Sequence, residues 1–133
     1  MAELSIEDRV MITDLIARYA RTLDSGDLDG YVRNFAPDGV LFEAHRGHDA
    51  IRTYVAGVIA RRHADPNRTR HFAGSPTIDG DSERATVHSY LLWITEGAEL
   101  PIHEAAEYND VVVKRDGRWV FESRVLTRLS GKR

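Results

Sequence analysis

The chain has 133 residues, 18 basic and 21 acidic side chains, a net charge of −3 at neutral pH, and no cysteine. This length predicts a single domain, residues 1–133, that is long enough to close a hydrophobic core. The lack of cysteine excludes a disulfide scaffold, a cysteine zinc site and a cysteine nucleophile. With six histidines present, we expect histidines and carboxylates to supply any chemistry near neutral pH.

The charge pattern argues against nucleic-acid and membrane partners. The basic residues are scattered through a slightly acidic chain, without the clustered positive charge that binds nucleic acid. No apolar run approaches the roughly 18 residues that a membrane-spanning helix needs. The first residues are acidic and helix-like, unlike a secretory signal. We therefore expect a cytoplasmic protein with no nucleic-acid or membrane partner.

The first half of the chain predicts three helices. Ser5 and Asp8 fit a capping box, and apolar residues recur after them at helical spacing as far as Leu23. Asp27 can cap a short second helix, and Asp49 can cap a third.

The remaining segments predict turns and strands. Residues 36–39, Ala-Pro-Asp-Gly, have the composition of a turn, and a short strand is expected at residues 40–45. Asp116-Gly117 is a strong hairpin signal. Four further strands are expected at residues 68–73, 83–95, 103–114 and 119–128, with a loop at 96–101.

This order of elements predicts an α+β fold, in which three N-terminal helices pack on one face of a mainly antiparallel sheet. Strands of about 10–13 residues must curl strongly to stay on so small a domain. A strongly curved sheet covered by helices encloses a pocket, which is a natural small-molecule site.

Three residues could carry chemistry in such a pocket, although spacing alone favours structural roles for them. Asp24 lies at the edge of the apolar stripe of the first helix, where it can point inward or simply begin the end of the helix. Tyr19 lies on that stripe, as core tyrosines do. His71 lies within a predicted strand whose two faces are both mixed in polarity.

The other histidines and the short motifs indicate no metal and no cofactor. His88 falls on the more polar face of its strand, and His45, His48, His63 and His103 are expected in loops or at strand ends, in contact with solvent. No two histidines have the i, i+4 spacing of a helical zinc site, and the chain has no glycine-rich phosphate loop.

Four segments in order nevertheless form a recognisable set. They are residues 18–27 (RYARTLDSGD), 35–40 (FAPDGV), 69–72 (TRHF) and 116–119 (DGRW). With this set the chain resembles the SnoaL-like branch of the nuclear transport factor 2-like superfamily. The nearest subgroup holds scytalone dehydratase, bile-acid 7α-dehydratase and hexachlorocyclohexane dehydrochlorinase. This resemblance implies a cone-shaped α+β barrel and cofactor-free chemistry.

The resemblance also implies roles for individual residues. Asp24 is similar to the aspartate that holds the catalytic histidine in this subgroup, and His71 is similar to that histidine. Tyr19 matches the tyrosine of the bile-acid enzyme. Tyr108 falls near the pocket asparagine of scytalone dehydratase, and Arg124 is similar to the pocket arginine of the dehydrochlorinase.

The chain departs from scytalone dehydratase at two places. The second catalytic histidine of that enzyme would fall near Ile94 and Thr95, neither of which can replace it. An apolar residue, Phe42, stands in place of its first-strand tyrosine. Scytalone itself is therefore not the expected substrate.

The function implied is that of a lyase or isomerase of the dehydratase type. His71, held by Asp24, would remove a carbon-bound proton, and Tyr19 with Tyr108 would polarise a carbonyl or donate to a leaving hydroxyl. A hydrophobic, ring-containing substrate is expected, because the side chains predicted to line the pocket are apolar or aromatic: Phe42, Tyr54, Val55 and Trp93.

Two alternatives stay open at this point. The same fold can serve as a non-catalytic ligand-binding or assembly module. Polyketide cyclisation by an aldol reaction would also use acid–base chemistry. By resemblance we expect a homo-oligomer, either a trimer or a dimer.

Overall fold

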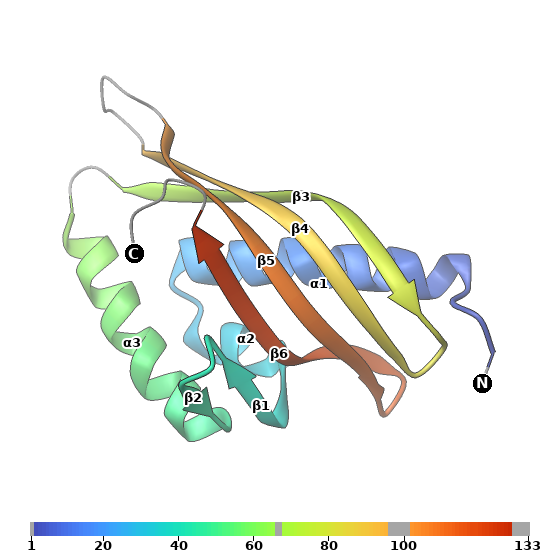
Figure 1. Ribbon diagram of the computed structural model, residues 1–133. Coiled ribbons are helices and arrows are strands. Elements are labelled where there is room, and N and C mark those ends of the chain that lie inside the picture. The colour runs from blue at the N-terminus through green and yellow to red at the C-terminus, as the bar shows by residue number, and fades with distance from the viewer. Residues whose placement is uncertain (1, 66–67, 96–101, 129–133) are drawn as a thin grey trace.

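The structure, a computed structural model, describes residues 2–65, 68–95 and 102–128 (Figure 1). Its elements in chain order are α1 (Ile6–Ser25), α2 (Leu28–Arg33), β1 (Phe35–Leu41), β2 (His45–Arg46), α3 (His48–Ala64), β3 (Thr69–Gly80), β4 (Arg84–Thr95), β5 (Ile102–Arg115) and β6 (Arg118–Arg128). The sheet has the order β2-β1-β6-β5-β4-β3, and every pair is antiparallel except β1 with β6. The predicted α+β class and the mainly antiparallel sheet are confirmed.

The sheet curves into an open cone. The strands β3 to β6 twist strongly as they cross the molecule, and α1 lies across one face of them (Figure 1). Helix α2 packs against α1, and α3 packs against α2, at the end of the molecule that carries β1 and β2 (Figure 1). Within the described ranges, no helix is long and apolar enough to cross a membrane.

The start and end of α1 follow the sequence closely. Ser5 accepts a hydrogen bond from the backbone of Asp8, and the Asp8 side chain accepts one from the backbone of Ser5, so the predicted capping box is confirmed. Gly26 ends the helix in the left-handed conformation, with φ of 77°. Asp27 then caps α2 through the backbone N–H of Gly30, as expected.

Two local predictions in this half are wrong. Residues 36–39 belong to strand β1 instead of a turn, and the strand ends at Leu41 instead of starting at residue 40. The cause is a parallel partner far along the chain: Phe35 pairs with Phe121, and an irregularity in the register absorbs the Pro-Asp-Gly segment.

The cap of α3 also differs from the prediction. The helix begins at His48, so that Asp49 lies in its first turn and Gly47 takes the cap position. Gly47 has φ of 87°, a left-handed conformation that favours glycine, and its carbonyl accepts the first helical hydrogen bond from Ile51. The negative charge of Asp49 still stabilises α3, because it lies in the first turn, near the positive end of the helix dipole.

The positions of the long strands agree with the sequence prediction, except that β3 is longer than predicted. Strand β3 continues to Gly80, seven residues beyond the predicted end, because an irregularity between Gly74 and Thr77 lets it pair with β4 again. Asp116 and Gly117 both have positive φ, which confirms the predicted hairpin between β5 and β6. The loop predicted at 96–101 lies outside the described residues.

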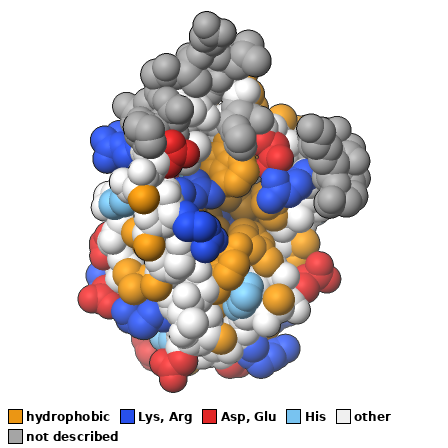
Figure 2. Space-filling model, turned by 90° about the vertical axis from the view of Figure 1, so that its left-hand side faces the viewer, with side chains coloured by type: hydrophobic (Ala, Val, Ile, Leu, Met, Phe, Trp, Pro, Cys, Tyr) orange, Lys and Arg blue, Asp and Glu red, His pale blue; other side chains and the backbone are white. Residues whose placement is uncertain are grey.

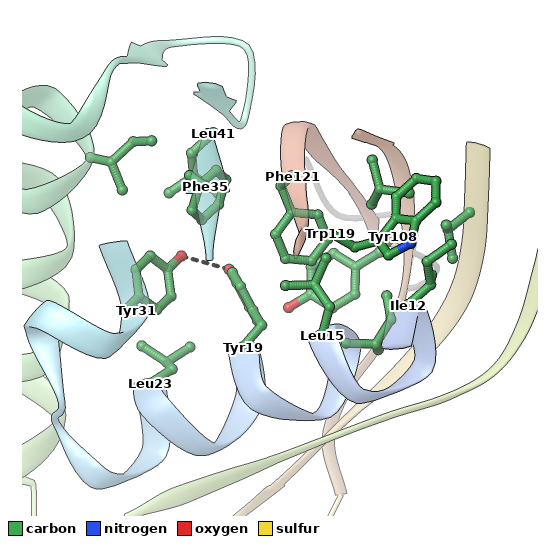
Figure 3. Packing of buried hydrophobic residues seen from close by; sticks show 14 of the residues in the cluster. Ile12, Leu15, Tyr19, Leu23, Tyr31, Phe35, Leu41, Tyr108, Trp119 and Phe121 are labelled. Atoms are coloured by element: carbon green, nitrogen blue, oxygen red, sulfur yellow. Dashed lines mark hydrogen bonds between the residues drawn. The ribbon is translucent and has the colours of Figure 1, made fainter. Parts of the chain in front are cut away.

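Tyr19 stands at the centre of the hydrophobic core (Figure 3). Its ring centroid lies 4.8 Å from that of Tyr31, 5.7 Å from that of Tyr108 and 5.8 Å from that of Phe121. Aromatic contacts of this kind add about 0.5–1.5 kcal/mol each beyond the buried area. They join α1 and α2 to the inner face of β5 and β6.

A buried carboxylate joins the other end of α1 to the β5–β6 hairpin. The Asp8 side chain accepts hydrogen bonds of 2.9 Å from Lys114 Nζ and 2.9 Å from Trp119 Nε1. These bonds hold the pKa of Asp8 well below its usual range. Asp8, a member of the capping box of α1, thus also makes a tertiary contact with the β5–β6 hairpin.

We predict that Asp8→Asn lowers the free energy of unfolding by about 1–3 kcal/mol at pH 7, because the charge-assisted bonds are lost. A depressed native pKa stabilises the fold above the unfolded pKa, near 4, and this contribution declines as the pH falls. The difference between wild type and variant should therefore narrow from pH 5 towards pH 2 in denaturant titrations. Asp14→Asn, in an exposed pair with Arg18, is the control and should cost under about 0.5 kcal/mol. A difference that grows towards acid pH would contradict this account.

Candidate active site

The last turn of α1 and the edge strand β3 meet through two hydrogen bonds. Asp24 Oδ1 lies 2.6 Å from His71 Nδ1, and Asp24 Oδ2 accepts a hydrogen bond of 2.9 Å from the backbone N–H of His71. An ionised carboxylate can only accept, so Nδ1 carries the proton. The contact therefore fixes one tautomer of the ring, with Nε2 unprotonated.

Two donors face the opposite side of the ring. Arg62 Nη1 lies 3.0 Å from His71 Nε2, and Trp93 Nε1 donates to the same nitrogen. Because arginine and indole N–H groups only donate, Nε2 must accept, and the ring is neutral. Burial lowers the pKa of His71 and the Arg62 charge lowers it further, while the Asp24 carboxylate opposes them.

His71 borders a cavity of about 340 Å³ between the helices and the inner face of the sheet. Such a volume is at the lower end of the range for small-molecule sites and suits a compact ring compound. Figure 2, which faces the side of the molecule that carries α3, shows hydrophobic side chains lining a hollow with basic side chains on either side. The residues expected from the sequence that border this cavity are Tyr19, Phe42, Tyr54, Val55, Trp93 and Tyr108.

A second, larger cleft of about 670 Å³ lies between α1 and β3, outside the inner cavity. Asp24 borders this outer cleft, and His71 borders both spaces. The Asp24–His71 pair thus forms part of the wall between them. Arg62 and Trp93, the donors to Nε2, both border the inner cavity, so Nε2 faces inward.

Three tyrosine hydroxyls meet at the inner cavity. Tyr31 donates a hydrogen bond of 2.7 Å to Tyr19 (Figure 3), and Tyr108 borders the same space. Burial raises the pKa of all three hydroxyls, so they stay protonated near neutral pH. Tyr31 uses its proton in the bond to Tyr19, whereas Tyr19 and Tyr108 can each donate to a substrate oxygen. The sequence analysis did not identify Tyr31 as a site residue, because its place in α2 gives no indication of this hydroxyl contact.

Arg124 requires a correction, because it lies behind the cavity wall instead of on its surface. Its guanidinium carbon is 3.5 Å from the ring centroid of Tyr108 and 4.2 Å from that of Tyr19. Asp110, its partner across the β5–β6 pair, accepts bonds of 2.8 and 3.0 Å and holds it there. The buried cation contacts the wall of the cavity through these two rings, and its charge also lowers the pKa of His71.

Arg62 is another residue of this site that the sequence reasoning missed. It follows Val55 and Val58 at helical spacing on the inward face of α3, so an arginine on an apolar stripe was the available signal. His88 is exposed on the outer face of β4, as expected. Among the described residues, no three histidine or acidic side chains lie close enough to hold a metal ion.

We predict that Asp24→Asn lowers the pKa of His71 below its value in the wild type. The hydrogen bond and the negative charge of Asp24 both favour the protonated ring, and the amide supplies neither a charge nor an equivalent acceptor. Titration of the ring followed by NMR measures the shift. Asp29→Asn, on the exposed start of α2, is the control and should leave the titration unchanged. An equal or higher pKa in Asp24→Asn would show that the carboxylate does not act on the ring.

The comparisons with known proteins agree with this architecture. Residues 4–125 match the SnoaL-like domain family. The structure resembles that of a protein of unknown function with a cystatin-like fold from Nostoc punctiforme, with a TM-score of 0.86 and 27% identity over 97% of this chain and 96% of that one. It also resembles a single-substitution variant of Rv3472, of unknown function, from Mycobacterium tuberculosis, with a TM-score of 0.79 and 28% identity over 93% and 77%.

A third similar structure carries a functional name. It is the "Putative Scytalone Dehydratase" of Novosphingobium aromaticivorans, with a TM-score of 0.75 and 25% identity over 96% of each chain. No curated protein matches the sequence significantly. The family match extends over nearly the whole chain, and it confirms the resemblance seen in the sequence. This protein therefore belongs to the SnoaL-like domain family.

Proposed function

We propose that the protein is a cofactor-free lyase or isomerase of the dehydratase type, acting on a small hydrophobic ring compound. The observation that carries this proposal is the buried, neutral His71, which is held by Asp24 and directs Nε2 toward an apolar cavity. A neutral imidazole with a fixed tautomer is the form that accepts a proton. The similarity to the "Putative Scytalone Dehydratase" of Novosphingobium aromaticivorans supports the same class of reaction.

In a dehydration, His71 Nε2 takes a proton from the carbon next to a carbonyl group. The electrons of that C–H bond form the new double bond, and the neighbouring hydroxyl leaves as water after receiving the proton from the imidazolium. Asp24 stabilises the imidazolium while it exists. Tyr19 and Tyr108 donate to the carbonyl oxygen, where negative charge develops.

The base nitrogen of His71 already accepts hydrogen bonds from two protein side chains. Arg62 and Trp93 both donate to Nε2, so these bonds must open before His71 can accept a proton. Hydrogen bonds in unoccupied sites often differ from those in the reacting complex, so the occupied nitrogen is compatible with a base. It is also the one observation that favours the alternative, binding without catalysis.

Polyketide cyclisation would begin with the same proton transfer. The carbanion would then attack a second carbonyl carbon and form a carbon–carbon bond instead of expelling a hydroxyl. Since both reactions use His71 in the same way, the products separate them. Mass spectrometry distinguishes loss of water from ring closure.

We predict that His71→Ala lowers turnover by about 10²–10⁴-fold for any β-hydroxy ring ketone that the wild type converts, because the base is removed. Asp24→Asn should lower turnover by a smaller factor. Dehydration of 3-hydroxy-1-tetralone to 1-naphthol, followed by fluorescence, is a suitable first assay within a panel of such ketones. His88→Ala, on the outer face of β4, is the control and should retain full turnover. Unchanged turnover in both site variants would exclude the proposed pair.

A further inference from the structure

Arg62 is a half-buried cation whose contacts are all uncharged. Its Nη1 donates to Thr69 Oγ1 at 2.9 Å and to His71 Nε2 at 3.0 Å, and its guanidinium carbon lies 4.6 Å from the ring centroid of Trp93. Among the described residues, no carboxylate forms an ion pair with it. Burial lowers the pKa of Arg62, which reflects the cost of removing this charge from water.

Other charges near the cavity leave Arg62 available to a ligand. Asp24 attracts it over a distance but uses its two oxygens to bind His71. Asp65 also borders the cavity and has contacts of its own. Arg128, on β6, also borders the cavity and is paired with Glu104. Arg62 thus places its guanidinium at the wall of the cavity, where no carboxylate of the described residues pairs with it.

We propose that Arg62 binds a carboxylate group of the substrate, so that the ring compound acted on is an anion. This inference rests on the proposed function for its catalytic meaning, but the binding itself does not require turnover. The guanidinium fork matches the two oxygens of a carboxylate, and such charge-assisted pairs are stronger than bonds to a neutral oxygen. Trp93 Nε1, already directed to the same point, can supply one more donor.

Binding of a carboxylate would also release the base. Arg62 and Trp93 would both exchange His71 Nε2 for the ligand oxygens, which removes both donors from the nitrogen that must accept the proton. The ligand charge would at the same time offset the positive charge of Arg62. His71 therefore becomes a better proton acceptor only when the substrate is in place. Arg62 is in this sense both a binding residue and a positioning residue for the base.

The test compares two probes of equal shape, 2-naphthoate and 2-naphthamide, by isothermal titration calorimetry at pH 7. Wild type should bind the naphthoate at least about tenfold more tightly than the amide. Arg62→Gln should lose this preference, and Arg62→Lys should keep only part of it. Arg33→Gln removes the same charge from an exposed arginine of α2 that does not line the cavity, and it should retain the preference.

Several outcomes would overturn the proposal. Failure of the naphthoate to bind, equal affinity for both probes in wild type, or an undiminished preference in Arg62→Gln would each do so. If Arg62→Gln does not fold, an unchanged preference in Arg62→Lys overturns the proposal instead.

An NMR titration of the His71 ring gives a second measurement. The pKa of this ring would not change if Arg62 had a purely structural role. The pKa of His71 should rise in Arg62→Gln, and it should rise in wild type when the naphthoate binds. An unchanged pKa in both cases contradicts the release of the base. These measurements need no turnover, so they test the carboxylate site independently of the reaction. If the wild type prefers the carboxylate and His71→Ala retains full turnover, the proposed reaction is rejected but the carboxylate-binding site is supported.

Discussion

The contact between the Asp24 carboxylate and His71 is the interaction on which the site depends. One oxygen accepts the backbone N–H of an edge strand, and the other accepts the ring N–H of the same residue. The first bond ties the end of α1 to β3, which closes the wall between the inner cavity and the outer cleft. The second fixes the tautomer. A single carboxylate therefore closes part of the wall of the cavity and fixes the tautomer of its histidine.

Burial gives this contact its chemical consequences. Removal from water lowers the pKa of His71 and raises those of the tyrosines around the cavity, so each group is neutral near pH 7. A neutral acceptor beside neutral donors can move a proton within an apolar space. Two charged side chains lie at the edge of the cavity. Arg124 is paired with Asp110 behind the tyrosine rings, and Arg62 extends from α3 to the cavity wall.

Local sequence patterns predicted the elements whose causes are local. The helical spacing that ends at Leu23 and the Asp116-Gly117 hairpin are of this kind. Strand β1 could not be predicted, because its hydrogen-bond partner β6 is the last strand of the chain. Within the site, the same limit applies: Asp24 and His71 are 47 residues apart, and only the family resemblance related them. The position of Arg124 depends on Asp110 in the neighbouring strand, which no spacing along one strand indicates.

The central claim is that His71 is a neutral base whose proton resides on Nδ1, facing Asp24. A long-range ¹H–¹⁵N correlation spectrum of the uniformly ¹⁵N-labelled protein at pH 7 measures this directly. The two ring nitrogens of His71 should show a protonated Nδ1 and an unprotonated Nε2. A ring protonated at both nitrogens, or one whose proton resides on Nε2, would contradict the account.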